Sequence, residues 1–214
     1  MSTAVPPHAA QPVLRRGPVA AQARVAVVLI HGRGDSASGI LSLADDLSLP
    51  DVTWLAPQAA ANTWYPNSFL APMPENEPGL TSGLSVIADL VETLADEGIP
   101  ADRVVLMGFS QGACLVQEFA ARNPRRYQGV VGLSGGLIGP PGTPRDYTGS
   151  FDGTAVFLGC SDVDPHIPVE RVHESAQVFM RMGALVDQRI YPRMGHTVNA
   201  DEIGATMAIL KGSI

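Results

Sequence analysis

Short apolar runs alternate with stretches of helical periodicity along most of this chain. Runs of buried-strand character span residues 23–30, 52–56, 103–107, 129–134, 155–159 and 186–191, and residues 12–15 could add a short edge strand. Helical spacing of apolar residues follows Ser36, resumes near Leu80, Gln111 and Pro168, and returns after Asn199. This alternation predicts an α/β fold, with a mostly parallel sheet of about six to seven strands and helices on both faces.

The predicted elements fit one domain without a large inserted cap. The chain has 214 residues, a length suited to a single core. Residues 1–10 include Pro6 and Pro7 and no periodic pattern, so we expect a loosely ordered N-terminal tail followed by a single domain over residues 11–214.

The composition of the chain limits which binding partners and which cellular compartment we expect. A net charge of -7 offers no surface for neutralising phosphates, so nucleic acid is not an expected partner. We expect no membrane span, because no apolar stretch has the necessary length, and the N-terminus lacks the apolar block of a signal peptide. Cys114 and Cys160 lack metal-ligand spacing and are expected as buried thiols, which favours a cytoplasmic protein.

A long segment between Pro57 and Pro78 has little periodicity but several aromatic residues. Loops of this length in a compact domain are usually functional or disordered, and the aromatic content favours function. Trp64 and Tyr65 either anchor the loop on the body or form a wall of a substrate pocket, and both readings stay open.

The candidate chemistry centres on Gly108-Phe109-Ser110-Gln111-Gly112, between an expected strand and an expected helix. A G-x-S-x-G sequence at such a junction is typical of a nucleophile elbow, in which a sharp turn exposes the serine hydroxyl. A serine needs a base, and His196 follows the last expected strand. An acid must orient that histidine, and both Asp162 and Asp164 qualify by position.

With these motifs the chain resembles the phospholipase/carboxylesterase branch of the α/β-hydrolases, which includes acyl-protein thioesterases and short-chain esterases. The resemblance rests on residues 31–34, 64–66, 108–112, 164–168 and 195–196. It implies that Asp164, followed by Pro-His-Ile-Pro, is the acid of a Ser110, Asp164, His196 triad. It also implies an oxyanion hole made by the backbone N–H groups of Arg33 and Gln111.

We expect substrate contacts from Trp64, Tyr65, Phe69, Phe109 and Ile167. Where this chain has Arg33, thioesterases of the family usually carry an apolar residue. Its side chain could meet a substrate carboxylate or phosphate, or pair with a nearby acid such as Asp35, and we favour the pairing.

The resulting expectation is a serine carboxylesterase that cleaves small or short-acyl esters through an acyl-enzyme. A thioesterase or lysophospholipase with the same triad is the nearest alternative, and a catalytically silent binding module is an alternative of another class. We expect no cofactor and no metal, since the dense set of Asp162, Asp164 and His166 lacks a second nearby histidine. Monomer and homodimer are both open.

Overall fold

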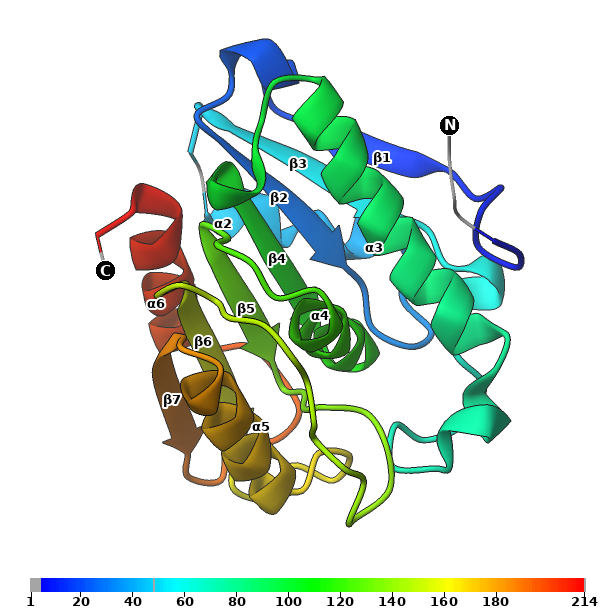
Figure 1. Ribbon diagram of the computed structural model, residues 1–214. Helices are drawn as coiled ribbons and strands as arrows, with labels where there is room; N and C mark the ends of the chain where they lie inside the picture. Colours follow the sequence, from blue (N-terminus) through cyan, green and yellow to red (C-terminus); the bar gives the residue numbers. More distant parts are fainter. Residues whose placement is uncertain (1–4, 48, 214) are drawn as a thin grey trace.

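The computed structural model describes residues 5–47 and 49–213, which form one sheet of seven strands. The strand order is β1-β3-β2-β4-β5-β6-β7, and all neighbours are parallel except β1 and β3 (Figure 1). The strands are β1 Val13–Arg16, β2 Val25–Ile30, β3 Val52–Pro57, β4 Val104–Phe109, β5 Gly129–Leu133, β6 Ala155–Ser161 and β7 Leu185–Tyr191. The α/β architecture and the expected strand count are therefore confirmed.

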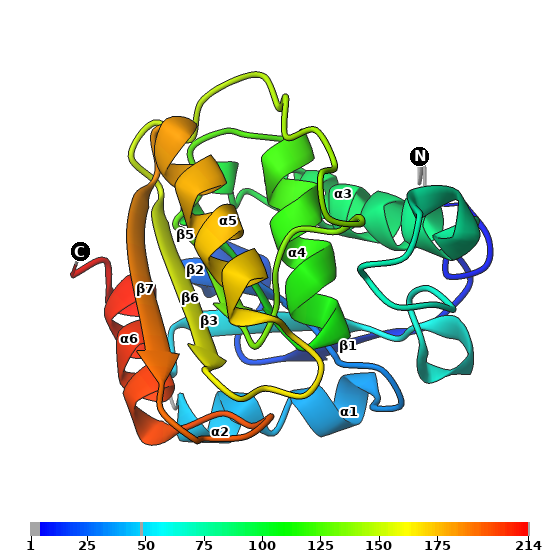
Figure 2. The same cartoon turned by 90° about the horizontal axis from the view of Figure 1, so that it is seen from below.

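Helices cover both faces of this sheet, as expected. They are α1 Ala37–Ile40, α2 Leu43–Asp46, α3 Gly79–Asp96, α4 Gln111–Arg122, α5 Val169–Arg181 and α6 Ala200–Lys211, with short 3-10 turns at Ala20–Gln22, Ala60–Asn62, Met73–Asn76 and Ala101–Arg103. Figure 2 shows α3, α4 and α5 on one side of the strongly twisted sheet, and α1, α2 and α6 on the other.

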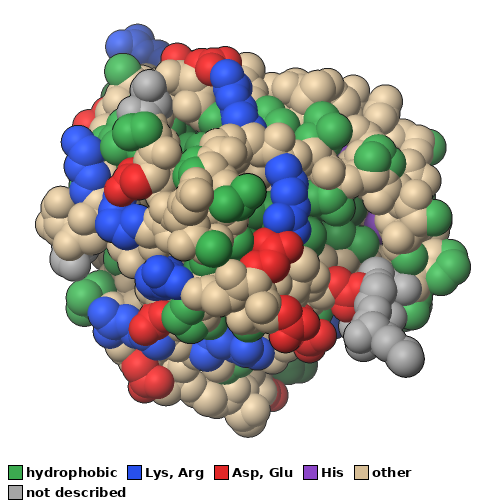
Figure 3. Space-filling model, turned by 90° about the horizontal axis from the view of Figure 1, so that it is seen from above, with side chains coloured by type: hydrophobic (Ala, Val, Ile, Leu, Met, Phe, Trp, Pro, Cys, Tyr) green, Lys and Arg blue, Asp and Glu red, His purple; other side chains and the backbone are tan. Residues whose placement is uncertain are grey.

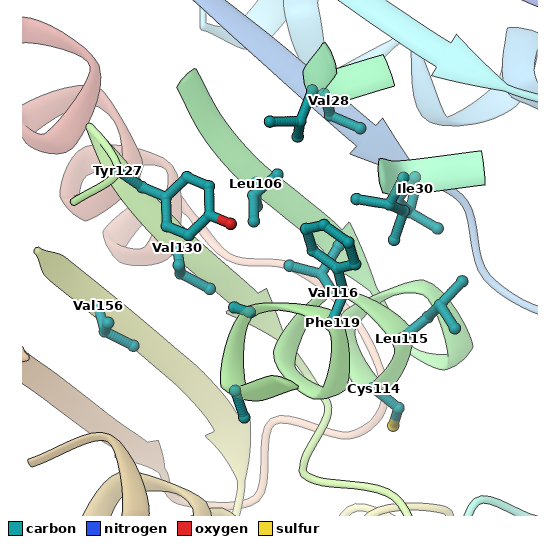
Figure 4. Close-up of a cluster of buried hydrophobic side chains, with 14 of the residues drawn as sticks. Val28, Ile30, Leu106, Cys114, Leu115, Val116, Phe119, Tyr127, Val130 and Val156 are labelled. Atoms are coloured by element: carbon teal, nitrogen blue, oxygen red, sulfur yellow. The ribbon is translucent and has the colours of Figure 1, made fainter. Parts of the chain in front are cut away.

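Each face has its own apolar core because the side chains of a strand alternate between the faces. In β2, Ala26, Val28 and Ile30 pack with α3 and α4, whereas Val25 and Leu29 point to the core under α1 and α6. Figure 4 shows the first of these cores, where apolar side chains of α4 lie against those of β2 and β4.

The helix expected after Ser36 is interrupted. Ser36 Oγ accepts a hydrogen bond from Gly39 N at 3.1 Å, which is the predicted N-cap. One turn later, Ser42 Oγ donates to the Gly39 carbonyl at 2.8 Å. Glycine and serine both weaken a helix interior, so the segment divides into α1 and α2.

The described part of the N-terminal segment, residues 5–10, contacts the domain through His8. The backbone N–H of His8 donates to Ser82 Oγ at 2.9 Å, and the imidazole is 3% exposed. Its Nε2 lies 2.9 Å from the Trp64 carbonyl, and its Nδ1 accepts from Ala60 N at 3.0 Å. The segment is therefore held by a buried side chain, which composition could not reveal. Residues 1–4 lie outside the described residues.

The surface mixes both signs of charge. On the face shown in Figure 3, basic and acidic side chains lie beside one another. Ion pairs such as Arg15 with Glu97, at 2.8 Å, and Arg24 with Asp51, at 2.6 Å, join distant segments. Within the part of the chain that the structure describes, no helix is both long and apolar enough to cross a bilayer.

Candidate active site

The register of the sheet brings the ends of several strands together. Ile30 of β2 pairs with Gly108 of β4, and Phe109 pairs with Leu133 of β5. Leu133 pairs in turn with Gly159 of β6. The loops that follow these strands therefore start at one edge of the sheet, where ligands usually bind in open α/β folds.

Ser110 occupies a sharp bend between β4 and α4. Its φ of 54° and ψ of -119° are unfavourable for a residue with a side chain, and such strain typically costs ~1–3 kcal/mol. A Cβ at Gly108 would lie 2.5 Å from the Gly112 carbonyl, and one at Gly112 would lie 2.2 Å from the Ile30 carbonyl. Only glycine fits at these two positions, because neighbouring backbone atoms lie where a side chain would start. The bend has the geometry of a nucleophile elbow.

His196 bridges Ser110 and Asp164. His196 Nε2 lies 2.8 Å from Ser110 Oγ, and Nδ1 lies 2.7 Å from Asp164 Oδ2. Because an ionised carboxylate can only accept, Nδ1 carries the proton and Nε2 is free to accept from the serine hydroxyl. The imidazole is flanked by the rings of Phe109 and His166, each with its centroid 4.9 Å away.

The structure distinguishes the two candidate acids. Asp164 has a fully buried side chain, and its Oδ1 accepts from the N–H groups of His166 and Ile167 at 2.8 and 3.0 Å. Burial raises the pKa of Asp164, but the bonds from His196 and the two N–H groups outweigh it, so the pKa lies below its ordinary value. Asp162 instead accepts from Arg193 N at 2.7 Å. Of the two carboxylates, Asp164 is the one bonded to the imidazole.

A thiol also faces Asp164. Cys160 Sγ lies 3.8 Å from Asp164 Oδ2, and burial raises the pKa of Cys160 to about 12. The thiol therefore stays protonated at neutral pH and can act as a weak donor to the carboxylate.

The turn after β2 lies against the serine. A Cβ at Gly32 would be 3.4 Å from Ser110 Cβ, and Gly32, Arg33 and Ser110 line the same cavity. The N–H of Gln111 starts α4, and the first N–H groups of a helix have no partner within it. The N–H groups of Arg33 and Gln111 are the predicted oxyanion donors.

His31 fixes the peptide that carries the Arg33 N–H. Its Nε2 accepts from Ala59 N at 3.1 Å, so its proton is on Nδ1, which lies 2.7 Å from the Gly32 carbonyl. Burial lowers the pKa of His31, which favours this neutral form. The carbonyl it holds belongs to the same planar unit as the Arg33 N–H, so the ring sets the direction of that donor.

The Gln111 side chain ties the long loop to the elbow. Its Oε1 accepts from Trp64 N at 2.8 Å, and its Nε2 donates to the Tyr65 carbonyl at 2.9 Å. Trp64 is fully buried, its ring contacts those of His8 and His31, and its Nε1 donates to the His31 carbonyl at 2.9 Å. Trp64 thus anchors the loop behind the pocket wall and does not form its surface.

A cavity of about 680 Å³ opens beside Ser110. Of the residues expected to contact substrate, Tyr65, Phe69, Phe109 and Ile167 line it. His166 and Asn67, which were not among the residues expected to contact substrate, also line it. A signal for His166 was present, since it lies two residues after Asp164 in the motif that carries the resemblance. Nothing in the sequence marks Asn67.

The favoured pairing of Arg33 with Asp35 is wrong. The guanidinium instead donates to the carbonyls of Pro66 and Asn67, at 2.9 and 2.6 Å. Over residues 5–47 and 49–213, no group of three His, Cys, Asp or Glu side chains has the arrangement of a metal site.

The protein has the features of an α/β-hydrolase. Its sheet is mostly parallel, its serine lies in a strand-turn-helix bend, and the aspartate and histidine follow later strands. The family model described as Phospholipase/Carboxylesterase matches residues 18–214. The chain therefore belongs to the phospholipase/carboxylesterase family, a hydrolase family of esterases and thioesterases.

Individual relatives agree with this membership. A crystal structure of a phospholipase/carboxylesterase from Dyadobacter fermentans is 42% identical with a TM-score of 0.90, and the match covers 94% of this chain and 97% of that one. Acyl-protein thioesterase 1 of Eremothecium gossypii is 27% identical over 90% of this chain and 89% of that protein. Zea mays acyl-protein thioesterase 2, at 20% identity and a TM-score of 0.72, covers 94% of this chain and 98% of that one and shares the fold.

Proposed function

We propose that the protein is a serine carboxylesterase that uses Ser110, His196 and Asp164 to cleave short-acyl esters through an acyl-enzyme. The observation that carries the proposal is the single imidazole hydrogen-bonded to both Ser110 Oγ and the buried Asp164. The two free cysteines, both buried, support the expectation of a reducing, cytoplasmic environment.

In the proposed reaction, Ser110 Oγ attacks the ester carbonyl while His196 Nε2 takes its proton. Asp164, ionised because its pKa is low, stabilises the imidazolium. The N–H groups of Arg33 and Gln111 meet the negative charge of the tetrahedral intermediate. His196 then protonates the leaving alcohol, and a water molecule repeats the sequence to release the acid.

The cavity beside Ser110 favours a small-molecule substrate. At about 680 Å³ it falls within the range of small-molecule sites, and the loop that walls it is held by buried hydrogen bonds. We therefore expect the highest kcat/KM for short acyl chains in a series of aryl esters. A clear preference for chains of twelve or more carbons would contradict this expectation.

The nearest alternative is a thioesterase or lysophospholipase with the same residues, and the names of the relatives favour testing it. Both reactions pass through the same acyl-enzyme, so the geometry of the triad does not separate them. Rates on matched oxoester and thioester substrates with one acyl group would do so.

The binding-module alternative is tested with Ser110→Ala. If the wild type hydrolyses esters and the variant loses this activity while keeping its melting temperature, the enzyme proposal is supported. Equal inactivity of both proteins on a broad ester panel would favour the silent module.

A further inference from the structure

We propose that the Arg33 side chain selects esters that carry a carboxylate a few bonds from the scissile carbonyl. This inference rests on the esterase function proposed above. It concerns the guanidinium only, because the backbone N–H of Arg33 is present whatever the side chain.

The guanidinium of Arg33, an exposed residue, is hydrogen-bonded to the backbone of the long loop. Nη1 donates to the Pro66 carbonyl at 2.9 Å and Nη2 to the Asn67 carbonyl at 2.6 Å. The group lies 5.9 Å from the centre of the Tyr65 ring. The loop that supplies these contacts is itself held, since Asn67 N donates to Asn76 Oδ1 at 2.9 Å. A charge held this way loses little entropy when it binds a ligand.

Over residues 5–47 and 49–213, no acidic side chain forms an ion pair with this guanidinium. Arg15, Arg24 and Arg189 each have a carboxylate oxygen within 2.8 Å, whereas Arg33 forms no such pair with any described residue. Carbonyl groups carry partial charges only, so a full positive charge remains. Two of the five N–H groups of the guanidinium are used, which leaves donors for a further acceptor.

The position of this charge relates it to the reaction. Arg33 and Ser110 line the same cavity, and the residue that presents the guanidinium also presents the expected oxyanion donor. A substrate carbonyl at that donor would place a carboxylate a few bonds away within reach of the guanidinium. Arginine suits carboxylates because its N–H groups match their two oxygens.

Asp35 provides an opposing charge on the same wall. It is half-buried and also lines the cavity. Its carboxylate repels an anionic substrate, so the preference for anionic over neutral esters depends on both Arg33 and Asp35. Removing each charge in turn should therefore shift the preference in opposite directions.

The experiment compares matched esters by titrating the released acid at constant pH. On the acyl side, monomethyl succinate is paired with methyl 4-methylpentanoate, in which an isopropyl group replaces the carboxylate. On the alcohol side, 3-acetoxypropanoate is paired with 3-methylbutyl acetate. The measured quantity is the ratio of kcat/KM for the anionic ester to that for the neutral ester, in wild type, Arg33→Met, Arg33→Lys and Asp35→Asn. Arg181→Met, at the end of α5, removes an equal charge outside the cavity.

We expect the wild type to prefer the anionic member of one pair, which identifies the side of the ester that Arg33 contacts. Arg33→Met should lower that ratio roughly 2- to 5-fold, the range for an ion pair at an exposed residue. Arg33→Lys should retain part of the preference, Asp35→Asn should increase it, and Arg181→Met should leave it unchanged. In the wild type, added NaCl should lower kcat/KM for the anionic ester more than for the neutral one.

Hydrolysis of the neutral esters without any preference for the anionic ones would overturn this inference and leave the esterase function intact. So would an equal loss on both members of a pair in Arg33→Met, because the side chain would then only support the loop. If Arg33→Met does not fold, the ester preference of Arg33→Lys and the salt dependence of the wild type still test whether Arg33 selects anionic esters. Failure of the wild type to hydrolyse any of the four esters, with Ser110→Ala equally inactive, would overturn both proposals.

Discussion

Glu202 offers a direct test of how the protein responds to pH. It lies in the first turn of α6, where its Oε2 accepts from Asn199 N at 2.9 Å in the predicted capping box. Its Oε1 has no hydrogen-bond partner among the described residues, and a Cβ at Gly159 of β6 would lie 2.2 Å from it. The carboxyl group is fully buried.

Burial raises the pKa of Glu202 from 4.5 to about 7, against the opposing effect of the Asn199 N–H. Because the folded state binds this proton more tightly than the unfolded state, the stabilising contribution is complete below about pH 4.5. It is lost as the pH rises from there through about 7. At ~1.4 kcal/mol per pH unit, the loss is on the order of 3 kcal/mol.

Glu202→Gln should remove this pH dependence. The Gln carbonyl can still accept from Asn199 N, and the amide does not titrate. Denaturant unfolding from pH 5 to pH 8 should show the wild type losing stability relative to the variant by on the order of 3 kcal/mol. Glu97→Gln is the control, because Glu97 pairs with Arg15 and has a lowered pKa, so its effect falls at lower pH. Parallel profiles for wild type and Glu202→Gln across this range would refute the reasoning.

Three further predictions concern the candidate site. Gly112→Ala should destabilise the protein by about 1–3 kcal/mol and abolish esterase activity, since the added methyl would lie 2.2 Å from a β2 carbonyl; thermal melting and ester hydrolysis measure both effects. Asp164→Asn should reduce kcat by orders of magnitude, about 10⁴-fold in a serine protease, and Asp162→Asn should have little effect; the reverse order would contradict the assigned acid. Trp64→Phe should cost about 1–3 kcal/mol in chemical denaturation because it leaves the buried His31 carbonyl without its donor, and an unchanged midpoint would argue against that role.

The fold was predictable because its signals are local. The β2 run from Val25 to Ile30 is buried on both faces and aliphatic throughout. The cap at Asn199 is formed with Glu202, three residues later in the sequence. The break between α1 and α2 was not foreseen, because apolar spacing alone does not show that serine and glycine weaken that turn.

In the candidate site, too, some residues could be predicted from the sequence and others could not. Ser110 and His196 could be assigned from their positions after strands, whereas the choice of Asp164 over Asp162 came from the family resemblance. The role of His8 could not be predicted, because its partners Ala60, Trp64 and Ser82 are more than 50 positions away in the sequence. The carbonyl partners of Arg33 were missed for a related reason, since they depend on where a long loop folds back.

These long-range contacts link the pocket wall to the chemistry. Gln111 begins α4 beside Ser110, and its side-chain amide holds the backbone of Trp64 and Tyr65 through two hydrogen bonds. Trp64 in turn bonds the carbonyl of His31, which orients the turn before Arg33. The elbow, the turn after β2 and the cavity wall are therefore one connected unit, so a change in the loop that alters the pocket should also alter the alignment of the proposed oxyanion donors. Substrate selection and catalytic rate are expected to vary together in this protein for that reason.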